Sequence, residues 1–509
     1  MIETSRPWRR LQWFPRGALT AVVVVVVAGG LWLGLTSGTA DQGASTIAQP
    51  SVSGPGSSGG PASAAASATV ASSGASRKRE FQRIDGFGSS ERTFGDPHVF
   101  EPDGVPPMSV AQQDAVLTAL YVDLGLTRVR PAQPDTTAGP PPGGIEIADD
   151  NADPSAVDRA KFNFEGKRLD DHASLLARAK SRGATVAWNS PLNREAWMGV
   201  SPGTDDAAEY AEWLLTQVKR FDERGGRLKY ISIANEPSFA RNTMSGEFMR
   251  DVIKKLGPRL EAERLLVPFV IPDDVRSSDG AAKAATILAD RSARRYVGAL
   301  ATHLYDEPLE NLAAMRALAR RYDLPLWMSE FTLDAMGSMR PRGSSAATPL
   351  DWALLMHELL ATYDVSAVDY LWGYFGGAKA NQTTLITLKG DQSGYDGFSR
   401  NKVYYYFGQY SRFVRPGARR VLVTSRGDPV KATAYRRDRT RTIVAINPGD
   451  GEATTTMTVP ALAGVRRLTQ TRTSATEHWA KPRAVSVKGT RVTVTLAPQS
   501  VTTLSGPAR

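Results

Sequence analysis

The sequence predicts an α/β protein: a (β/α)8 TIM barrel with a C-terminal antiparallel β-sandwich domain, preceded by one transmembrane helix and a disordered linker. Between residues 77 and 410, eight short apolar runs alternate with longer amphipathic runs, which is the pattern of parallel strands that are each followed by a helix. After residue 411, alternating segments are divided by turns about every ten residues, a pattern typical of a β-sandwich. Before residue 77 there is an apolar run and then a segment that is poor in apolar surface.

The first 76 residues contain three segments of different composition. Residues 1–17 are basic, which predicts a cytoplasmic N-terminus. Residues 18–36 are uncharged and long enough to cross a bilayer, so we expect a transmembrane signal anchor with the rest of the chain outside the cell membrane. A secretory signal cleaved near Ala40 is the alternative, and it would give a secreted protein. Residues 37–76 are rich in Ser, Ala, Gly and Pro, and we expect them to form a disordered linker.

The barrel prediction assigns each apolar run to a strand. The expected strands cover residues 83–90, 126–131, 184–189, 229–235, 265–271, 297–304, 324–330 and 365–372. Helical patterns lie between them at 169–183, 205–225, 309–322 and 351–363. A doubly wound sheet is the structural alternative, but no glycine-rich phosphate turn supports it. The β-sandwich should then span 411–509, with a strand from 78–84 as a further candidate member.

The composition argues against several classes of site. The chain has no cysteine, so disulfides and thiolate metal ligands are excluded. None of its five histidines pairs with another at ligand spacing beside an acid, and we expect no metal or other cofactor. The net charge of +10 is spread along the chain. Because no long Lys/Arg run is interleaved with aromatic residues, nucleic acid is not an expected partner.

Two of the expected strands end in a glutamate. The stretch "YISIANEPS" (230–238) stops at Asn235 and Glu236, and "LWMSE" (326–330) stops at Glu330. Catalytic groups of a (β/α)8 barrel project from the C-terminal ends of its strands. A surface carboxylate is the alternative for a single glutamate, but two carboxyl groups that face each other across a barrel are the equipment of glycoside hydrolysis.

An ordered set of short motifs matches a known family. The matching pieces are "IDGFGSS", "LTRVRP", "WNSPLNREAWM" (188–198), "IANEPS", "THLY" (302–305), "WMSEF" and "NKVYYYFGQYSRFVRPGARRV" (401–421). Together they cover residues 80–505, and on them the chain resembles glycoside hydrolase family 30, clan A retaining glycosidases with a (β/α)8 barrel and a β-sandwich side domain. The resemblance implies that Glu236 is the general acid/base and Glu330 the nucleophile. It also implies that Asn235 binds the 2-hydroxyl of the sugar.

The same resemblance assigns supporting residues. His303 and Tyr305 match the pair on the sixth strand, and Tyr305 would donate a hydrogen bond to Glu330. Arg128, or Arg130 two residues later on the same face, would support the nucleophile electrostatically. Independently of the family, retention requires the two carboxyl groups about 5 Å apart. At that distance the charge of Glu330 would raise the pKa of Glu236 and keep it protonated for the first step.

Aromatic residues near the strand ends are candidate walls of the sugar subsite. Trp188, Trp197 and Trp372 could each stack on a pyranose ring, with a buried core position as the alternative for each, and Asn189 is a further candidate substrate contact. Four other residues lie in helical patterns and are expected to be structural: Trp213, Trp352, His172 and His357.

The sequence therefore predicts an exported retaining β-glycoside hydrolase that acts on a polysaccharide or oligosaccharide. The loop at 188–198 resembles that of family 30 members that cut β-1,6-linked galactan or glucan, and this resemblance implies such a substrate. A cell-envelope exopolysaccharide is also consistent with a membrane anchor. Two alternatives stay open. One is a transglycosylase that uses the same residues, and the other is a non-catalytic carbohydrate-binding envelope protein.

Overall fold

The computed structural model describes residues 25–27, 30–32, 80–100, 106–132, 145–146, 148–164, 169–192, 194–198, 206–239, 243–339, 347–377, 384–426 and 429–508. The chain divides into two compact units, Met1–Ala75 and Ser76–Arg509. In the first unit, β1 (Val25–Val27) and β2 (Gly30–Trp32) pair as antiparallel strands.

The N-terminal expectations meet the structure only at these two strands. The described part of segment 18–36 is extended rather than helical, which differs from the expected helix and suits β-branched valines. Across the described ranges, no helix has the length and apolarity to span a membrane. The basic segment 1–17 and the linker 37–76 lie outside the described residues.

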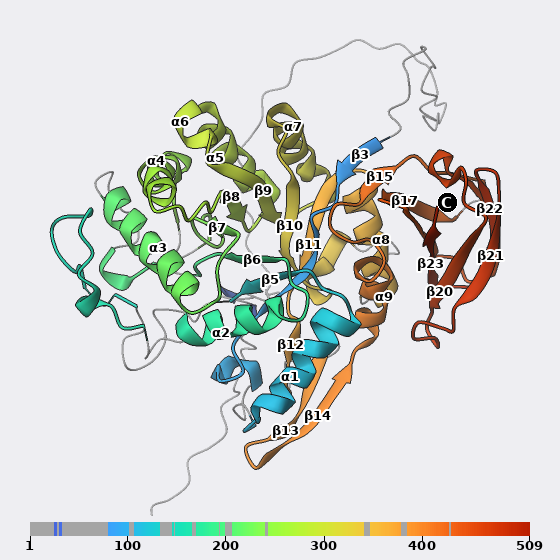
Figure 1. Ribbon diagram of the computed structural model, residues 1–509, viewed down its shortest axis with the longest axis horizontal. Coiled ribbons are helices and arrows are strands. Elements are labelled where there is room, and N and C mark those ends of the chain that lie inside the picture. The colour runs from blue at the N-terminus through green and yellow to red at the C-terminus, as the bar shows by residue number, and fades with distance from the viewer. Residues whose placement is uncertain are drawn as a thin grey trace, which may run out of the picture. The chain divides into compact units, whose positions relative to one another are not determined.

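The second unit contains the predicted closed barrel (Figure 1). Its parallel strands follow the chain from β4 to β11, and β11 pairs with β4 to close the ring. Each lies where the sequence predicts a strand: β4 (Gly86–Glu91), β5 (Arg128–Pro131), β6 (Val186–Asn189), β7 (Tyr230–Ser232), β8 (Phe269–Asp274), β9 (Val297–His303), β10 (Leu326–Phe331) and β11 (Val365–Tyr370).

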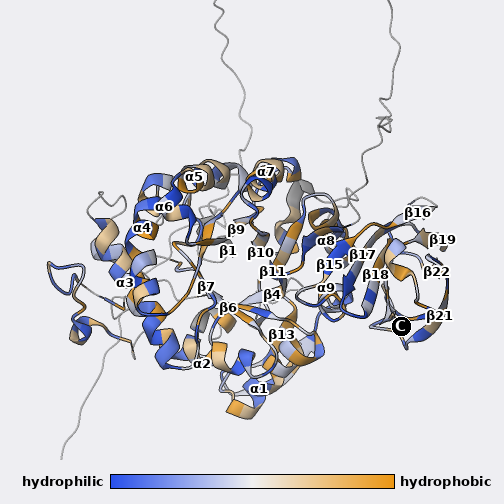
Figure 2. Ribbon diagram, turned by 45° about the horizontal axis from the view of Figure 1, so that its top comes forward, coloured by the Kyte–Doolittle hydropathy of each residue, from blue (hydrophilic) through white to orange (hydrophobic). Residues whose placement is uncertain are grey.

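Helices form an outer layer around these strands (Figure 1). They are α1 (Val110–Thr118), α2 (Leu169–Lys180), α3 (Asp206–Glu223), α4 (Gly246–Ala262), α5 (Ser277–Ala289), α6 (Arg291–Arg294), α7 (Leu312–Tyr322) and α8 (Pro349–Ala361). A π-helical turn (Ala119–Asp123) continues α1. Figure 2 shows hydrophobic and hydrophilic residues mixed along these helices, as expected for helices with one buried face.

The barrel has two apolar layers. A small cluster fills its interior, including Trp188, Val270 and Trp327. A larger cluster packs the outer faces of the strands against the helices. Because both faces of each strand are buried, the strands read as continuous apolar runs in the sequence. This is why a charged residue at a strand end is conspicuous.

The C-terminal region is the predicted antiparallel domain, a ten-stranded sheet in the order β16-β19-β22-β21-β20-β23-β18-β17-β15-β3. Its members are β3 (Glu80–Arg83), β15 (Arg419–Val421), β16 (Thr424–Arg426), β17 (Lys431–Arg437), β18 (Thr440–Asn447), β19 (Ala453–Thr458), β20 (Arg467–Thr473), β21 (Arg483–Lys488), β22 (Arg491–Leu496) and β23 (Ser500–Pro507). They enclose a separate apolar core.

Two features link this sheet to the barrel. Strand β3 (Glu80–Arg83) comes before the barrel in sequence but pairs with β15, and Figure 1 shows the two side by side. Helix α9 (Lys402–Ser411) lies between the two parts, and Thr503 donates a hydrogen bond to the Gln409 carbonyl oxygen.

A third, small sheet consists of β12 (Tyr374–Phe375), β13 (Ile386–Asp391) and β14 (Gly394–Arg400), and the sequence analysis did not predict it.

Candidate active site

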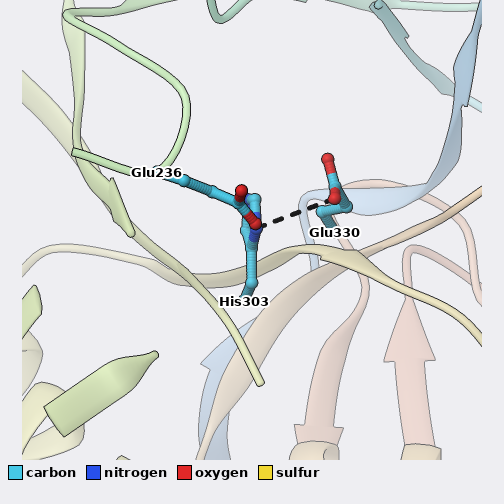
Figure 3. A group of neighbouring side chains, drawn as sticks. All are labelled: Glu236, His303 and Glu330. Atoms are coloured by element: carbon cyan, nitrogen blue, oxygen red, sulfur yellow. Dashed lines mark hydrogen bonds and ion pairs between the residues drawn. The ribbon is translucent and has the colours of Figure 1, made fainter. Parts of the chain in front are cut away.

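Glu236 and Glu330 meet at the C-terminal end of the barrel. Glu330 lies within β10, and Glu236 follows β7 in the left-handed backbone region at φ 50°. The Glu236 backbone N–H donates to the Asp273 carbonyl oxygen at 2.9 Å, which fixes this turn. One carboxylate oxygen of each glutamate and one ring nitrogen of His303 all lie within 4.8 Å of one another. Figure 3 shows the His303 side chain against the Glu236 carboxyl group, with Glu330 across from both, and Nδ1 of His303 lies 3.8 Å from Oε1 of Glu330.

Glu330 accepts hydrogen bonds from a residue of β5 and from a residue of the turn after β9. Arg130 of β5 donates to Oε2 at 2.6 Å, and the Tyr305 hydroxyl donates to Oε1 at 3.0 Å. The Tyr305 contact is the one expected from the sequence. Both donors stabilise negative charge on the carboxylate. Desolvation raises the pKa of the Tyr305 hydroxyl, and the negative charge of Glu330 adds to this.

Glu236 lies in a different environment. Its Oε1 lies 2.8 Å from Nδ1 of His303. Burial raises the pKa of Glu236, and the charge of Glu330 adds to this, while His303 and Arg130 act in the opposite direction. Burial alone would lower the pKa of His303, but the charge of Glu330 and the contacts with Asp273 and Glu236 raise it to about 10. A protonated imidazole is a hydrogen-bond donor and a poor metal ligand.

Asp273 connects these groups, although the sequence analysis did not select it. It accepts hydrogen bonds from the Ser190 and Ser329 hydroxyls, and it lies 3.5 Å from Arg130 and 3.4 Å from His303. Burial, which would raise the pKa of Asp273, is outweighed by the charges of Arg130 and His303, so the pKa is lowered. Asp273 is therefore a charged carboxylate beneath the two glutamates.

The structure separates the two arginines of β5. Arg130 contacts Glu330, but Arg128 forms a two-pronged pair with Asp369 at 2.8 and 2.8 Å and lies over the Trp327 ring at 3.9 Å. Because residues two apart on a strand point to the same face, both side chains enter the barrel, with Arg128 one layer deeper. Arg128 therefore does not meet the candidate nucleophile.

The candidate wall residues differ in burial. Trp188 is completely buried in the barrel interior, where its indole N–H donates to Asp369 at 3.2 Å. It is part of the core and lies too deep to line a subsite. Trp372 and Trp197 are half-buried, and the Trp197 indole N–H donates to the Glu146 carbonyl oxygen at 3.0 Å. The residues expected to be structural are buried: Trp213, Trp352, His172 and His357.

Two asparagines present amides at the site. Asn235 accepts a hydrogen bond from Arg130 through its side-chain oxygen, so the amide nitrogen is its donor group. Asn189 is fully buried at the end of β6, and neither polar atom of its amide has a hydrogen-bond partner in the described part of the chain. An unpaired buried amide is unfavourable unless a ligand or water satisfies it.

The sequence analysis did not select Asp273 and Asp369, although the position of each in the sequence indicates a buried carboxylate. Asp273 follows the apolar run of β8 just as Glu236 and Glu330 follow theirs, and Asp369 interrupts the apolar run of β11. A carboxylate at such a position must find a buried partner. The partners, Arg130 and Arg128, come from a strand far away in sequence.

Comparisons with known proteins agree with this fold. No protein-family model matches the chain. The family 30 subfamily 8 xylanase Xyn30A from Clostridium acetobutylicum is 23% identical, with a TM-score of 0.63 over 84% of this chain and 98% of that one. The catalytic domain of the family 30 xylanase C from Talaromyces cellulolyticus is 21% identical, with a TM-score of 0.64 over 84% and 98%. An endo-β-1,6-glucanase is 18% identical, with a TM-score of 0.61 over 85% and 93%. The chain thus has the fold of solved glycoside hydrolase family 30 enzymes, a (β/α)8 barrel with an antiparallel side sheet.

Proposed function

We propose that this protein is an exported retaining β-glycoside hydrolase that acts on a polysaccharide. The observation that carries the proposal is the pair of carboxyl groups of Glu236 and Glu330, with oxygens within 4.8 Å of each other and with different partners. This separation suits a covalent double displacement, whereas inversion needs a wider gap for a water molecule.

The first half-reaction uses the two groups in complementary protonation states. Glu330, with Arg130 and Tyr305 as donors, attacks the anomeric carbon. Glu236, whose pKa is raised, gives its proton to the leaving oxygen. The Asn235 amide donates to the sugar 2-hydroxyl, a contact that tightens as positive charge develops on the ring.

The second half-reaction reverses the role of Glu236. Once Glu330 is esterified it carries no charge, so it no longer opposes ionisation of Glu236, while His303 and Arg130 still favour it. Glu236 then removes a proton from water, which attacks the glycosyl-enzyme. The same pair of acids thus serves both steps.

A stereochemical experiment tests both assignments. The Glu330→Ala variant of the full-length protein should lose hydrolysis of an aryl β-glycoside, and added azide should give the α-glycosyl azide by a single displacement. The Glu236→Ala variant should still form the glycosyl-enzyme from an activated substrate, and azide should give the β-glycosyl azide. Unchanged hydrolysis by Glu330→Ala, or the same anomer from both variants, would refute the assigned roles.

The proposed substrate is a β-1,6-linked galactan or glucan, or an exopolysaccharide of the cell envelope. The support is the loop at 188–198 and the likeness in fold to an endo-β-1,6-glucanase. Digestion of β-1,6-glucan, β-1,6-galactan and xylan in parallel, with product sizes measured, separates this proposal from a xylanase. Products lengthened by an added acceptor sugar would favour the transglycosylase alternative. Binding without cleavage in every assay would favour the carbohydrate-binding alternative.

Export and membrane attachment complete the proposal. They rest on the basic residues 1–17 and the uncharged run 18–36. Protease added to intact cells should digest the barrel, and the protein should stay in the membrane fraction. An N-terminus near residue 41 and release into the medium would instead indicate cleavage after Ala40. Protection from protease in intact cells would contradict export.

A further inference from the structure

Five acidic side chains gather beside the barrel, away from the candidate active site. Glu146, Asp149 and Asp150 come from the segment that follows β5, and Glu209 and Glu212 come from α3. They form two groups of three that share Asp150, and within each group one carboxylate oxygen per residue lies within 4.8 Å of the others.

Two oxygens in this cluster lack any hydrogen-bond partner in the described part of the chain. They are Oδ1 of Asp150 and Oε2 of Glu212, whose residues are only 8% and 2% exposed. One carboxylate oxygen of Asp150 and one of Glu212 lie within 4.8 Å of each other, so two acceptors face each other. Buried carboxylates are normally paired or bound to a metal, and such an arrangement calls for a cation between them.

The described residues supply little positive charge here. Arg259 is the one cation among them within ion-pair distance, and it lies 3.8 Å from Oε2 of Glu212, too far for a hydrogen bond to that oxygen.

We propose that this acidic cluster binds a calcium ion, held by Asp150, Glu209 and Glu212 with Glu146 and Asp149 beside it. The donors are all oxygen atoms, which favours a hard cation over Zn²⁺. Several carboxylates from a loop and a helix suit the large and irregular coordination shell of Ca²⁺, whereas Mg²⁺ requires a compact octahedron. The site is separate from the two catalytic glutamates, so this proposal does not depend on the proposed function.

Such an ion would fix the loops beside the barrel mouth. The backbone N–H groups of Ile145 and Glu146 donate to Glu195, and so does the indole of Trp213 on α3. The Glu146 carbonyl oxygen accepts from the Trp197 indole. Hydrogen bonds to Glu195 thus already connect the segments after β5 and β6 to α3. A bound Ca²⁺ would add ionic contacts between α3 and the segment after β5.

The test uses the full-length protein freed of divalent cations. We expect 1 mM Ca²⁺ to raise the Tm by a few degrees, because an ion that binds only the folded state stabilises it. We also expect Tb³⁺, which has the size of Ca²⁺, to luminesce on excitation of tryptophan, and Ca²⁺ to displace it. The expected sensitisers are the indoles of Trp197, which donates to the Glu146 carbonyl oxygen, and of Trp213, which donates to Glu195.

Variants separate a calcium site from a mere cluster of acids. Asp150→Asn should abolish the Ca²⁺-dependent shift and the Tb³⁺ signal, yet melt no lower than wild type without Ca²⁺, because repulsion is relieved. Glu209→Gln, at a half-buried position, is a milder second variant and should weaken Ca²⁺ binding at least tenfold. Asp222→Asn removes an equal charge from the far end of α3 and should keep the full response. No Tm shift and no Tb³⁺ signal in wild type, or an equal shift with Mg²⁺, would overturn the assignment to Ca²⁺.

Discussion

Replacing Arg130 with methionine is expected to lower the free energy of unfolding and to shift the pH dependence of catalysis. Arg130 lies 2.6 Å from Glu330 and 3.5 Å from Asp273, and it also donates to the Asn235 side chain. All of these groups are buried. Methionine keeps the apolar stem of the side chain but leaves two carboxylates without their common cation.

The magnitude follows from these distances. At an effective dielectric constant of about 20, two unit charges 2.6 Å apart interact by roughly 6 kcal/mol. The lost attraction is partly offset because methionine avoids the cost of desolvating the arginine. Breaking a buried ion pair typically destabilises a protein by about 3–5 kcal/mol. We expect a loss of that size in the free energy of unfolding, measured by urea denaturation at neutral pH.

The effect on catalysis concerns charge balance. With Glu236 protonated, the charges of Glu330, Asp273, Arg130 and His303 sum to zero. Without Arg130 the site carries one net negative charge and holds protons more tightly. Since one nearby opposite charge moves a titration by about 1–3 pH units, the acid limb of the kcat/KM profile should move at least about one unit to higher pH.

Arg128→Met is the matched control. It lies two residues earlier on β5, is equally buried and pairs with Asp369, so it should cost similar stability. Its acid limb should stay in place because Arg128 does not contact Glu330. Arg130→Lys keeps the positive charge, so its acid limb should also stay in place. This variant provides a second test if Arg130→Met folds poorly. An equal shift in Arg128→Met, or none in Arg130→Met, would refute the reasoning.

Three further variants probe single contacts. Asn235→Ala should lower kcat/KM by about 10²-fold or more, since contacts to the 2-hydroxyl supply several kcal/mol in the transition state; a 2-deoxy substrate should show little difference between variant and wild type. His303→Gln removes a cation that lowers the pKa of Glu236, so the basic limb of the kcat/KM profile should move to higher pH; an unmoved limb would contradict this. Burial raises the pKa of Glu91 in the folded state to about 8, although hydrogen bonds from Ser89 and Tyr121 act in the opposite direction. The contribution of Glu91 to the free energy of unfolding is therefore fully present below about pH 4.5. It falls as the pH rises to 8, by up to about 1.4 kcal/mol per pH unit. Glu91→Gln should flatten this slope in denaturant titrations at pH 5 and pH 8, and an unchanged slope would show that Glu91 is not its source.

The barrel could be predicted because its strands carry a local signal. Each strand is buried on both faces, so an apolar run marks it regardless of its neighbours. The small sheet β12-β14 gave no such signal, because most residues of β13 and β14 are only half-buried or exposed. In the segment 18–36, an apolar run is present but does not determine the type of secondary structure. Its six consecutive valines are compatible with either a helix in a bilayer or a strand in water, and sequence periodicity does not separate the two.

The candidate site was predictable only in part. Glu236 and Glu330 stand out because each ends an apolar run in an acid. The choice between Arg128 and Arg130 depends on which layer of the barrel each side chain reaches, and that is set by the stagger of strands far apart in sequence. The core position of Trp188 has the same cause. Its indole N–H is satisfied by Asp369, a partner 181 residues away.

Asp273 is the residue whose role is best revealed by removing its charge alone. Asp273→Asn keeps an acceptor for one serine hydroxyl but leaves the site with one net positive charge when Glu236 is protonated. The proton should then leave Glu236 more readily, so the basic limb should move to lower pH. Substrates with poor leaving groups, which need that proton, should lose far more activity than activated aryl glycosides.

Asp369→Asn provides the comparison, since it removes a buried carboxylate one layer deeper, beside Arg128. It should destabilise the barrel without changing the dependence on the leaving group. If Asp273→Asn instead lowered the rates of good and poor leaving groups equally, with the basic limb unmoved, the proton on Glu236 would be governed by its own burial and by Glu330, and Asp273 would serve only to hold Ser190 and Ser329 in place.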